Sequence, residues 1–133
     1  MAAARQRLRR YLDDELGACC DEDVEQRLDE LATLEAGIGT AQADAELDVL
    51  SALASETRYR LVRVLVAAGE ELCVCELNAV VDVSESGLSH ALSELVDAGL
   101  VDGRKDGRWK KYRATNRAVA LVTVLEGSVS ADE

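Results

Sequence analysis

Residues 75–100 read CELNAVVDVSESGLSHALSELVDAGL and predict two short helices around a tight turn. The first helix covers residues 75–81, and Asp82-Val83 forms the turn. Ser84 is a typical N-cap for the second helix, which runs to the residue before Gly99. Two short helices joined in this way are the helix-turn-helix motif. The leucines that recur at helical spacing and should face the core are Leu88, Leu92 and Leu95.

Two further helices are predicted before this motif. Ser55 indicates the start of a helix over Glu56–Ala68, and Gly69 indicates its end. An earlier helix is expected over Glu46–Ala54, because apolar residues recur on one of its faces. The residues expected to face the core in these two helices are Leu47, Leu50, Leu53, Leu61, Val64 and Leu65.

A short basic hairpin and a last helix follow the motif. Leu100–Arg104 and Arg108–Arg113 are predicted to pair as strands around the turn Lys105-Asp106-Gly107, since Asp-Gly is a strong hairpin signal. The last helix, Asn116–Glu126, is apolar on every side over residues 118–122. Such a helix has no face for solvent, so a partner should cover it, and we expect a dimer.

The N-terminal residues predict a helical extension. Residues 8–16 carry leucines at helical spacing, and the acids of residues 21–23 suit the start of a second helix. Cys19 and Cys20 lie at the turn between these helices. The expected division is residues 1–43 for the extension, 44–127 for the main domain and 128–133 for a disordered tail.

The charge of the chain is acidic and unevenly distributed. The net charge is −11 over 133 residues, which alone argues against a nucleic-acid partner. Yet seven Lys or Arg lie between Arg104 and Arg117, whereas Arg27 is the only basic residue from Leu12 to Asp48. The acid excess, with three Lys against twelve Arg, resembles proteins of salt-loving organisms. High salt screens phosphate contacts, so few cations do not exclude DNA binding.

Hydropathy and cysteine usage both bear on the cellular compartment. No apolar run approaches the roughly 20 residues of a membrane span, and the N-terminus lacks the features of a signal peptide. We therefore expect a cytoplasmic protein with no membrane partner. Four cysteines in that compartment are more often reduced metal ligands or redox thiols than disulfides.

The order helix, helix-turn-helix, basic hairpin and apolar helix resembles a winged-helix repressor, and four segments resemble the ArsR/SmtB metalloregulator family. The resemblance covers roughly residues 47–125, and Cys73-Val74-Cys75 resembles specifically the arsenic- and antimony-responsive repressors. The segments are Leu53-Ala54-Ser55-Glu56-Thr57-Arg58, Glu71-Leu72-Cys73-Val74-Cys75-Glu76-Leu77, Leu95-Val96-Asp97-Ala98-Gly99-Leu100-Val101 and Gly107-Arg108-Trp109-Lys110-Lys111-Tyr112-Arg113.

This resemblance implies a fold and a function. The expected fold is mainly α with a small β-hairpin: a dimeric winged helix-turn-helix with an N-terminal helical extension. The implied function is a homodimeric repressor on double-stranded operator DNA, released when trivalent arsenic or antimony binds cysteine thiolates. The chain departs from the family at Asn78, where arsenic sensors with a complete local site have a third cysteine. It also has Ser89-His90-Ala91 where the reading helix usually carries Arg or His pairs.

The candidate metal ligands are Cys73, Cys75, Cys19 and Cys20. Trivalent arsenic and antimony prefer three soft thiolates. Side chains two apart diverge on a helix, so Cys73 and Cys75 can share one ion only if Cys73 lies just outside the helix that Cys75 opens. The candidates for the third ligand are Cys19 and Cys20, as in family members that recruit an N-terminal vicinal pair from the other subunit.

The candidate DNA-binding residues lie on the second helix of the motif and on the hairpin. Short hydroxyls and a histidine on the helix can contact bases or phosphates, and a hairpin tip can present several cations to one DNA backbone. Either set can equally be a solvated surface. Trp109 and Tyr112 are expected to pack the hairpin onto the body of the domain. The candidate DNA-binding residues are Ser84, Ser86, Gly87, Ser89, His90, Arg104, Lys105, Arg108, Lys110 and Lys111.

Other interpretations remain open at this point. The cysteines can be small buried hydrophobes, or a thiol redox switch on the same repressor scaffold. Zinc or cadmium could take four cysteines, although His90 is the only histidine. An enzyme is not expected, because the chain has neither a glycine-rich phosphate loop nor the spacing of dithiol redox motifs.

Overall fold

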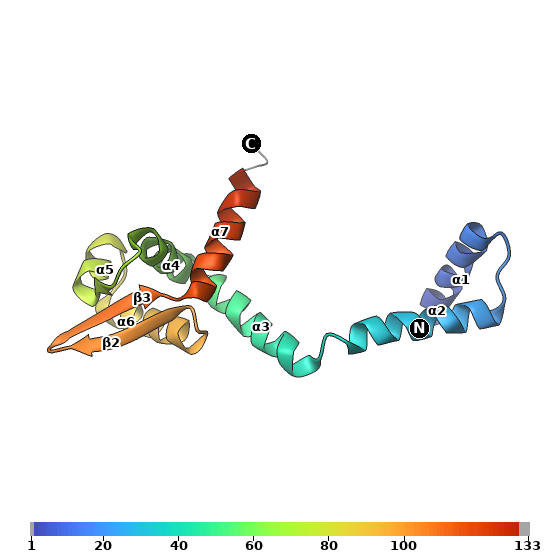
Figure 1. Ribbon diagram of the computed structural model, residues 1–133, viewed down its shortest axis with the longest axis horizontal. Helices are drawn as coiled ribbons and strands as arrows, with labels where there is room; N and C mark the ends of the chain where they lie inside the picture. The colour runs from blue at the N-terminus through green and yellow to red at the C-terminus, as the bar shows by residue number, and fades with distance from the viewer. Residues whose placement is uncertain (1, 131–133) are drawn as a thin grey trace. The chain divides into compact units, whose positions relative to one another are not determined.

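The computed structural model describes residues 2–130, which form seven helices and three strands (Figure 1). The chain divides into two compact units, Met1–Asp44 and Ala45–Glu133. The elements are α1 (Ala2–Leu16), α2 (Asp21–Ala36), α3 (Thr40–Leu53), α4 (Glu56–Ala68), β1 (Leu72–Cys73), α5 (Val74–Val80), α6 (Glu85–Asp97), β2 (Val101–Asp106), β3 (Trp109–Ala114) and α7 (Asn116–Ser130).

Local capping fixes the ends of the central helices, as the sequence predicts. The Ser55 hydroxyl accepts a hydrogen bond from the backbone N–H of Arg58, and the Ser84 hydroxyl accepts one from Gly87. These bonds satisfy N–H groups that have no partner within the first turn of a helix. Gly69 ends α4 with a left-handed φ of 66°, which glycine adopts without steric cost. The helix-turn-helix of α5 and α6 is thereby confirmed.

The core of the second unit lies between α4, α5, α6 and the sheet. It includes the predicted leucines of α4 and α6, and burying one leucine side chain contributes about 1.5–3 kcal/mol. Tyr112 packs against this core, as expected. The largest fully buried side chains of this unit are Leu61, Leu65, Leu77, Leu88, Leu92, Leu95, Leu100, Val62, Val101 and Val122.

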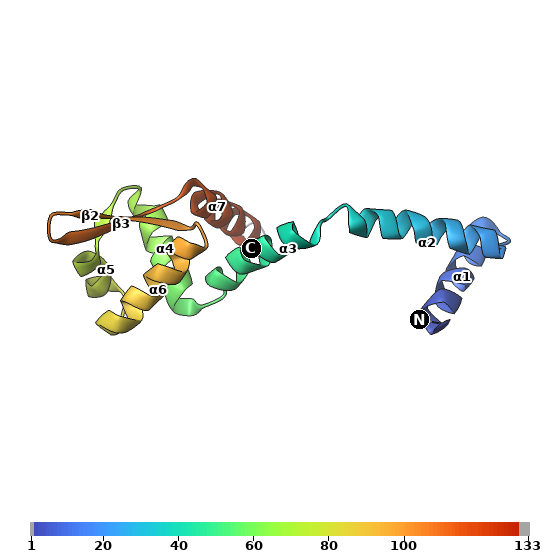
Figure 2. The ribbon, with the colours of Figure 1, turned by 90° about the horizontal axis from the view of Figure 1, so that it is seen from below.

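The sheet has three antiparallel strands in the order β1-β3-β2. The hairpin loop is Gly107-Arg108, whereas the sequence predicted the turn at Lys105-Asp106-Gly107. Lys105 and Asp106 belong to strand β2 instead, where they pair with Lys110 and Trp109 of β3. Gly107 has a φ of 64°, as the first position of a tight two-residue hairpin loop requires. The two-residue strand β1, which the sequence analysis missed, joins the helix-turn-helix to the hairpin. In both ribbon views the hairpin tip extends beyond α5 and α6 (Figures 1 and 2).

Two helices near the ends of this unit differ from the prediction. α3 starts at Thr40 rather than Glu46, and Leu47 and Leu50 are 58% and 55% exposed, so the expected inward face is wrong there. Ala52 is the buried residue of α3, because Val49, Ala52 and Leu53 form the side that meets the core. α7 continues to Ser130, so residues 128–130 are helical rather than a disordered tail; residues 131–133 lie outside the described part.

The first unit is a helical hairpin, as predicted. α1 and α2 pack together around Leu12 and Val24, and their connection holds Cys19 and Cys20. Ion pairs of Arg5 with Glu25 and of Arg9 with Asp21 link the two helices. Over residues 2–130, no helix combines the length and the apolar character needed to cross a bilayer.

Candidate nucleic-acid interface and thiol site

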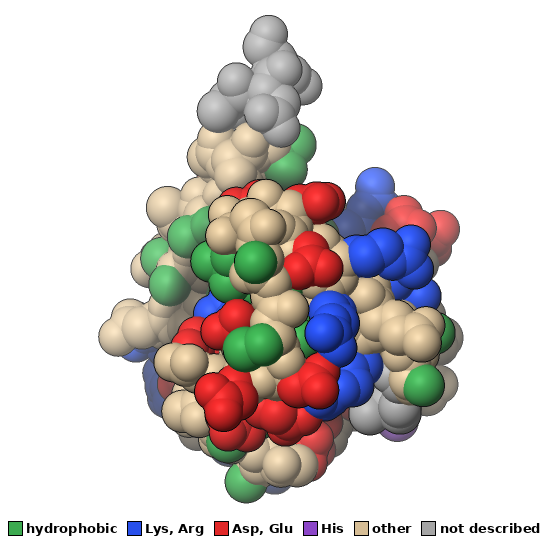
Figure 3. Space-filling model, turned by 90° about the vertical axis from the view of Figure 1, so that its right-hand side faces the viewer, with side chains coloured by type: hydrophobic (Ala, Val, Ile, Leu, Met, Phe, Trp, Pro, Cys, Tyr) green, Lys and Arg blue, Asp and Glu red, His purple; other side chains and the backbone are tan. Residues whose placement is uncertain are grey.

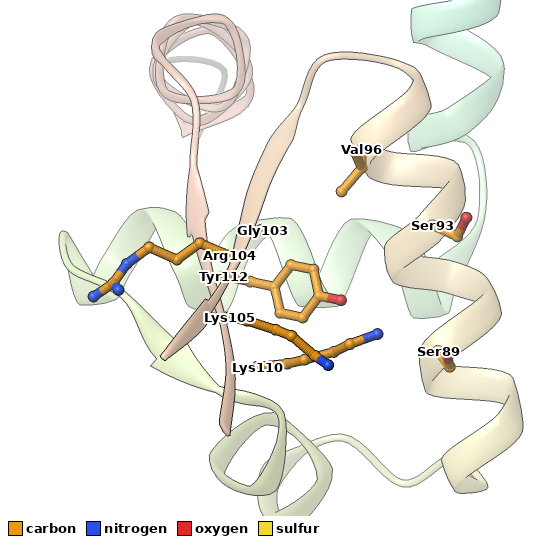
Figure 4. A pocket seen from close by; sticks show the side chains of 8 residues that line it. All are labelled: Ser89, Ser93, Val96, Gly103, Arg104, Lys105, Lys110 and Tyr112. Carbon is orange, nitrogen blue, oxygen red and sulfur yellow. The ribbon is translucent and has the colours of Figure 1, made fainter. Parts of the chain in front are cut away.

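The groove between α6 and the hairpin gathers hydroxyl and cationic side chains. Its volume is about 440 Å³. Figure 4 shows Lys105 and Lys110 extending from the hairpin toward α6, where Ser89 lies, whereas Arg104 points to the other side. Ser93 also faces this groove, although it was not among the candidate residues. The lining residues are Ser89, Ser93, Val96, Gly103, Arg104, Lys105, Lys110 and Tyr112.

Strand alternation divides the cations of the hairpin into two sets. Lys105 is the cross-strand partner of Lys110, and Arg104 is the partner of Lys111. Residues directly opposite each other project from the same face of a sheet, and consecutive residues project from opposite faces. The two lysines of the first pair therefore share the face toward α6, and the second pair shares the other face.

The pair Lys105–Lys110 is electrostatically unfavourable without an anion. Like charges directly opposite one another destabilise a sheet. Within residues 2–130 neither lysine forms an ion pair with an acidic side chain. A phosphate held between the two ammonium groups would relieve this repulsion. The groove thus has the charge and the hydroxyl groups expected of a surface that contacts DNA.

A glycine lets the aromatic ring of Tyr112 lie across the floor of this groove. A Cβ added to Gly103 would lie 2.6 Å from the ring of Tyr112, its cross-strand partner. Neither residue was predicted to line the interface, although an aromatic opposite a glycine in a hairpin is visible in the sequence once the register is known. Trp109, which was expected to pack on the body, is 47% exposed at the tip, with the Arg108 guanidinium 4.9 Å from its ring centroid.

Arg104 and Lys111 are already paired with acids. The Arg104 guanidinium donates to both carboxylate oxygens of Glu71, at 2.6 and 2.7 Å. This hydrogen-bonded guanidinium holds the pKa of Glu71 below its ordinary value. Lys111 lies 3.1 Å from the carboxylate of Asp106 and lowers the pKa of that group. Of the five predicted hairpin cations, these two are therefore less available to phosphate than Lys105, Arg108 and Lys110.

Four other candidate DNA-binding residues, at the N-cap and in the first two turns of α6, have contacts within the protein itself. Ser84 is the N-cap, and its hydroxyl lies 3.3 Å from that of Ser86. A Cβ on Gly87 would lie 2.8 Å from the side chain of Val83, so glycine serves close packing there. His90 is exposed and lies 3.2 Å from Glu94, one turn further along α6. DNA contacts by these residues stay a prediction.

The sulfur atoms of Cys73 and Cys75 lie together at the start of α5. Cys73 is the N-cap residue, with extended φ and ψ of −70° and 148°, and its sulfur accepts a hydrogen bond from the backbone N–H of Cys75. The two sulfurs are 2.8 Å apart. The expectation that Cys73 lies just outside the helix is thereby confirmed. This position outside the helix brings two side chains together that would diverge within it.

Hydrogen bonding makes the two thiols chemically unequal. The Cys75 thiol and the Cys75 backbone N–H both donate to the sulfur of Cys73, which lowers the pKa of Cys73. The same thiol–thiol contact raises the pKa of Cys75. The Cys73 sulfur, which accepts two hydrogen bonds, is therefore the better placed of the two to hold a negative charge. A thiolate beside a second thiol is a donor set that suits a soft ion such as trivalent arsenic.

A cleft of about 430 Å³ opens beside these thiols. The side-chain oxygen of Asn78 is buried there and has no hydrogen-bond partner among residues 2–130. Glu85 at the start of α6 and the tip of the hairpin close the other sides, so the thiols lie close to both DNA-facing elements. The lining residues are Cys73, Val74, Cys75, Asn78, Glu85, Arg108, Trp109 and Lys110.

Cys19 and Cys20 lie in the connection between α1 and α2 of the first unit, next to acidic residues of both helices. Asp23 accepts hydrogen bonds from the backbone N–H and the thiol of Cys20, at 3.2 and 3.4 Å. Burial, with the nearby carboxylates of Asp13 and Asp23, raises the pKa of Cys19. Figure 3 shows that acidic (red) and basic (blue) side chains are both exposed at the surface. Among the described residues, no three His, Cys, Asp or Glu side chains of one chain form a metal-binding group.

These elements define a class of protein. A helix-turn-helix whose second helix faces a cationic β-hairpin is a winged-helix DNA-binding domain. Residues 55–102 match the family model described as bacterial regulatory protein, arsR family. The match covers the helices around the thiols, the reading helix and the start of the wing.

Two relatives connect this class to metal resistance. The chain is 56% identical over 126 residues to a putative arsenical resistance operon repressor of Halobacterium salinarum, covering 95% of this chain and 98% of the relative. It is 35% identical over 81 residues to a cadmium resistance transcriptional regulatory protein of Listeria innocua, covering 61% of this chain and 66% of that protein.

Two solved structures agree with the fold. A crystal structure of a possible transcriptional regulator for arsenical resistance has a TM-score of 0.51 and 39% identity, covering 62% of this chain and 83% of that one. A homodimeric winged helix-turn-helix DNA-binding domain from Mycobacterium bovis, a possible ArsR-family transcriptional regulator, has a TM-score of 0.61 and 25% identity. The shares covered are 71% of this chain and 86% of that one.

The chain belongs to the ArsR family and is a transcriptional repressor of the arsenical-resistance type. It is a DNA-binding regulator and not an enzyme.

Proposed function

We propose that this repressor binds operator DNA as a homodimer and leaves it when trivalent arsenic or antimony binds Cys73 and Cys75. The observation that carries the proposal is the position of the thiol pair. Cys73 belongs to β1, which is hydrogen-bonded to wing strand β3, and it caps α5, the first helix of the reading motif. Binding of an ion at these sulfurs therefore acts on both elements that face the DNA.

The third thiolate is proposed to come from Cys19 or Cys20, of the same subunit or of the partner. Cys73 and Cys75 supply only two of the three sulfurs that trivalent arsenic prefers. The N-terminal pair is the remaining source of thiols in the chain.

The homodimer is proposed from the exposed apolar side chains of α7 and α3. Val124 and Val129 are 66% and 64% exposed, and Leu47 and Leu50 are similarly open to solvent. One of the solved relatives is described as homodimeric. The acid excess and the relative from Halobacterium salinarum support a working environment of high salt. The experiments below therefore use high salt.

An operator-binding titration tests the proposal. Labelled promoter DNA is bound by the full-length protein at high salt and titrated with arsenite, antimonite, cadmium, zinc or an oxidant. Arsenite and antimonite should release the DNA, and Cys73→Ser and Cys75→Ser should abolish the release. Continued operator binding at saturating arsenite would refute it. Release by cadmium or zinc alone, or by oxidant alone, would instead support a Cd/Zn sensor or a thiol redox switch.

X-ray absorption of the arsenite complex tests the third ligand. Three sulfurs around arsenic are expected in the wild type and two in the Cys19→Ser/Cys20→Ser variant. Three-sulfur coordination that survives in this variant would remove the N-terminal pair from the site.

A further inference from the structure

The thiol segment and the wing share one face of the sheet. Lys111 in the central strand β3 is the cross-strand partner of Cys73 in β1 and of Arg104 in β2. Because cross-strand partners project from the same face, Cys73, Lys111 and Arg104 form a row on the face opposite the paired lysines of the groove. A site on this row is thus linked to the wing through the sheet itself.

An ion pair closes this row across the central strand. Arg104 reaches Glu71, which lies two residues before Cys73 in the chain, and binds both of its carboxylate oxygens. Bidentate pairing fixes the orientation of both partners more strongly than a single hydrogen bond does. The Glu71 side chain is 26% exposed and that of Arg104 is 54% exposed, so the pair lies at the surface and its specificity comes from its bidentate geometry. The Arg104 side chain also points away from α6 (Figure 4), although Arg104 contributes to the lining of the groove.

Ion capture must change the contacts at one end of this connection. Both sulfurs must be thiolates to bind one ion, so the Cys75 thiol loses its proton. The hydrogen bond that this thiol donates to the Cys73 sulfur is then lost. Capture therefore changes the contacts of Cys73, which lies two residues after Glu71 in the chain.

We infer that the Glu71–Arg104 pair transmits ion capture from the thiols to the wing, and that Arg104 is a positioning residue rather than a phosphate contact. This inference rests on the proposed function and names how its two sites communicate. The pair ties the wing strand β2 to the thiol segment, whereas strand alternation alone points Lys105 and Lys110 toward the groove. When the thiol segment moves, the wing moves with it through this pair.

The two roles of Arg104 predict opposite effects of Glu71→Gln. If Arg104 contacted phosphate, removing the acid would free a cation, strengthen operator binding and steepen its dependence on salt. If Arg104 positions the wing, Glu71→Gln and Arg104→Gln remove the same connection. Both variants then lose response to arsenite while the number of phosphate contacts stays the same.

The experiment measures operator affinity with and without arsenite in the full-length protein, at several salt concentrations. The variants are Glu71→Gln, Arg104→Gln, the double variant and the charge exchange Glu71→Arg/Arg104→Glu. Each single variant should reduce the ratio of the two affinities by about 2- to 30-fold, and the double variant by no more than either single. The exchange should recover part of the ratio, and no single variant should change the salt slope.

Two controls separate this role from general destabilisation. Arsenite binding, followed by thiolate absorbance, should be retained in all four variants. Lys105→Gln, at a residue that lines the groove and not the thiol cleft, should alter the salt slope but leave the arsenite response intact. An unchanged affinity ratio in both single variants, or a salt slope that falls by about one in Arg104→Gln, would overturn the inference alone. Failure of arsenite to release the wild type would instead refute the proposed function, and the inference with it.

Discussion

Lys110 and Lys111 are neighbours in β3, yet the pleat of the strand gives them different surroundings. Lys110 faces the groove opposite Lys105, and Lys111 faces Asp106 at 3.1 Å. A cation that binds phosphate releases condensed counterions from the DNA, whereas a cation neutralised by its own acid releases few. Adjacent residues of the same type should therefore contribute unequally to DNA binding.

Lys110→Gln should weaken operator binding and reduce the slope of log affinity against log salt by about 1. Lys111→Gln is the matched control, with the same substitution one residue away, and should change the slope much less. Fluorescence anisotropy of labelled operator DNA at four or more salt concentrations measures both slopes. Equal losses of slope in the two variants would show that strand alternation does not sort these cations.

Ser84 shows how one side chain can serve the start of α6 whatever it contributes to DNA binding. Its hydroxyl accepts a hydrogen bond from the Gly87 N–H at 3.0 Å. Ser84→Ala should lower the free energy of unfolding by about 1 kcal/mol, because an N–H of the first turn loses its acceptor. Ser84→Asp keeps an acceptor at the cap and should retain most of the stability.

Urea unfolding followed by circular dichroism measures these stabilities, and operator binding measures the second role. If Ser84 only caps α6, operator affinity per folded protein stays close to wild type in Ser84→Ala. Loss of affinity without loss of stability would instead assign Ser84 to the DNA, as the sequence analysis predicted. Ser84→Asp adds a negative charge near DNA, so Ser84→Ala is the informative variant for affinity.

Helices whose ends are set by neighbouring residues could be predicted from the sequence. Strands and ion pairs that depend on residues far along the chain could not. The ends of α4 and α6 follow from Ser55, Gly69 and Ser84, because capping acts within one helical turn. β1 was missed because two residues carry no periodic signal, and its pairing with β3 spans almost forty positions. The Glu71–Arg104 pair is equally non-local.

The candidate DNA site was predicted as a set of residues but not as an arrangement. The hairpin cations were identified from their charge, while the loop was placed one step early. A one-residue error in register reverses the face of every side chain in a strand. With the loop at Gly107-Arg108, strand alternation alone places Lys105 and Lys110 on one face of the hairpin. Arg104 and Lys111 lie on the opposite face.

The second unit has apolar surface that its own core does not use. In α7, Ala118 and Val122 are buried against the core, whereas Val124 and Val129 are exposed. Exposed apolar side chains on a helix favour association with another helix. A repressor that reads two half-sites also needs a fixed spacing between two reading helices, which a dimer supplies.

Val124→Lys/Val129→Lys should therefore convert the proposed dimer into a monomer, because four lysines would have to be buried in the interface of the two chains. Thr123→Lys, which adds charge at an exposed polar position of the same helix, is the control and should stay dimeric. Sedimentation at high salt measures the mass, and circular dichroism checks that α7 remains helical. Operator affinity of the monomer should fall by about 10²- to 10⁴-fold, since two half-sites are no longer bound by one linked unit. A double-lysine variant that still sediments as a dimer would move the interface away from α7, with the exposed leucines of α3 as the next surface to substitute.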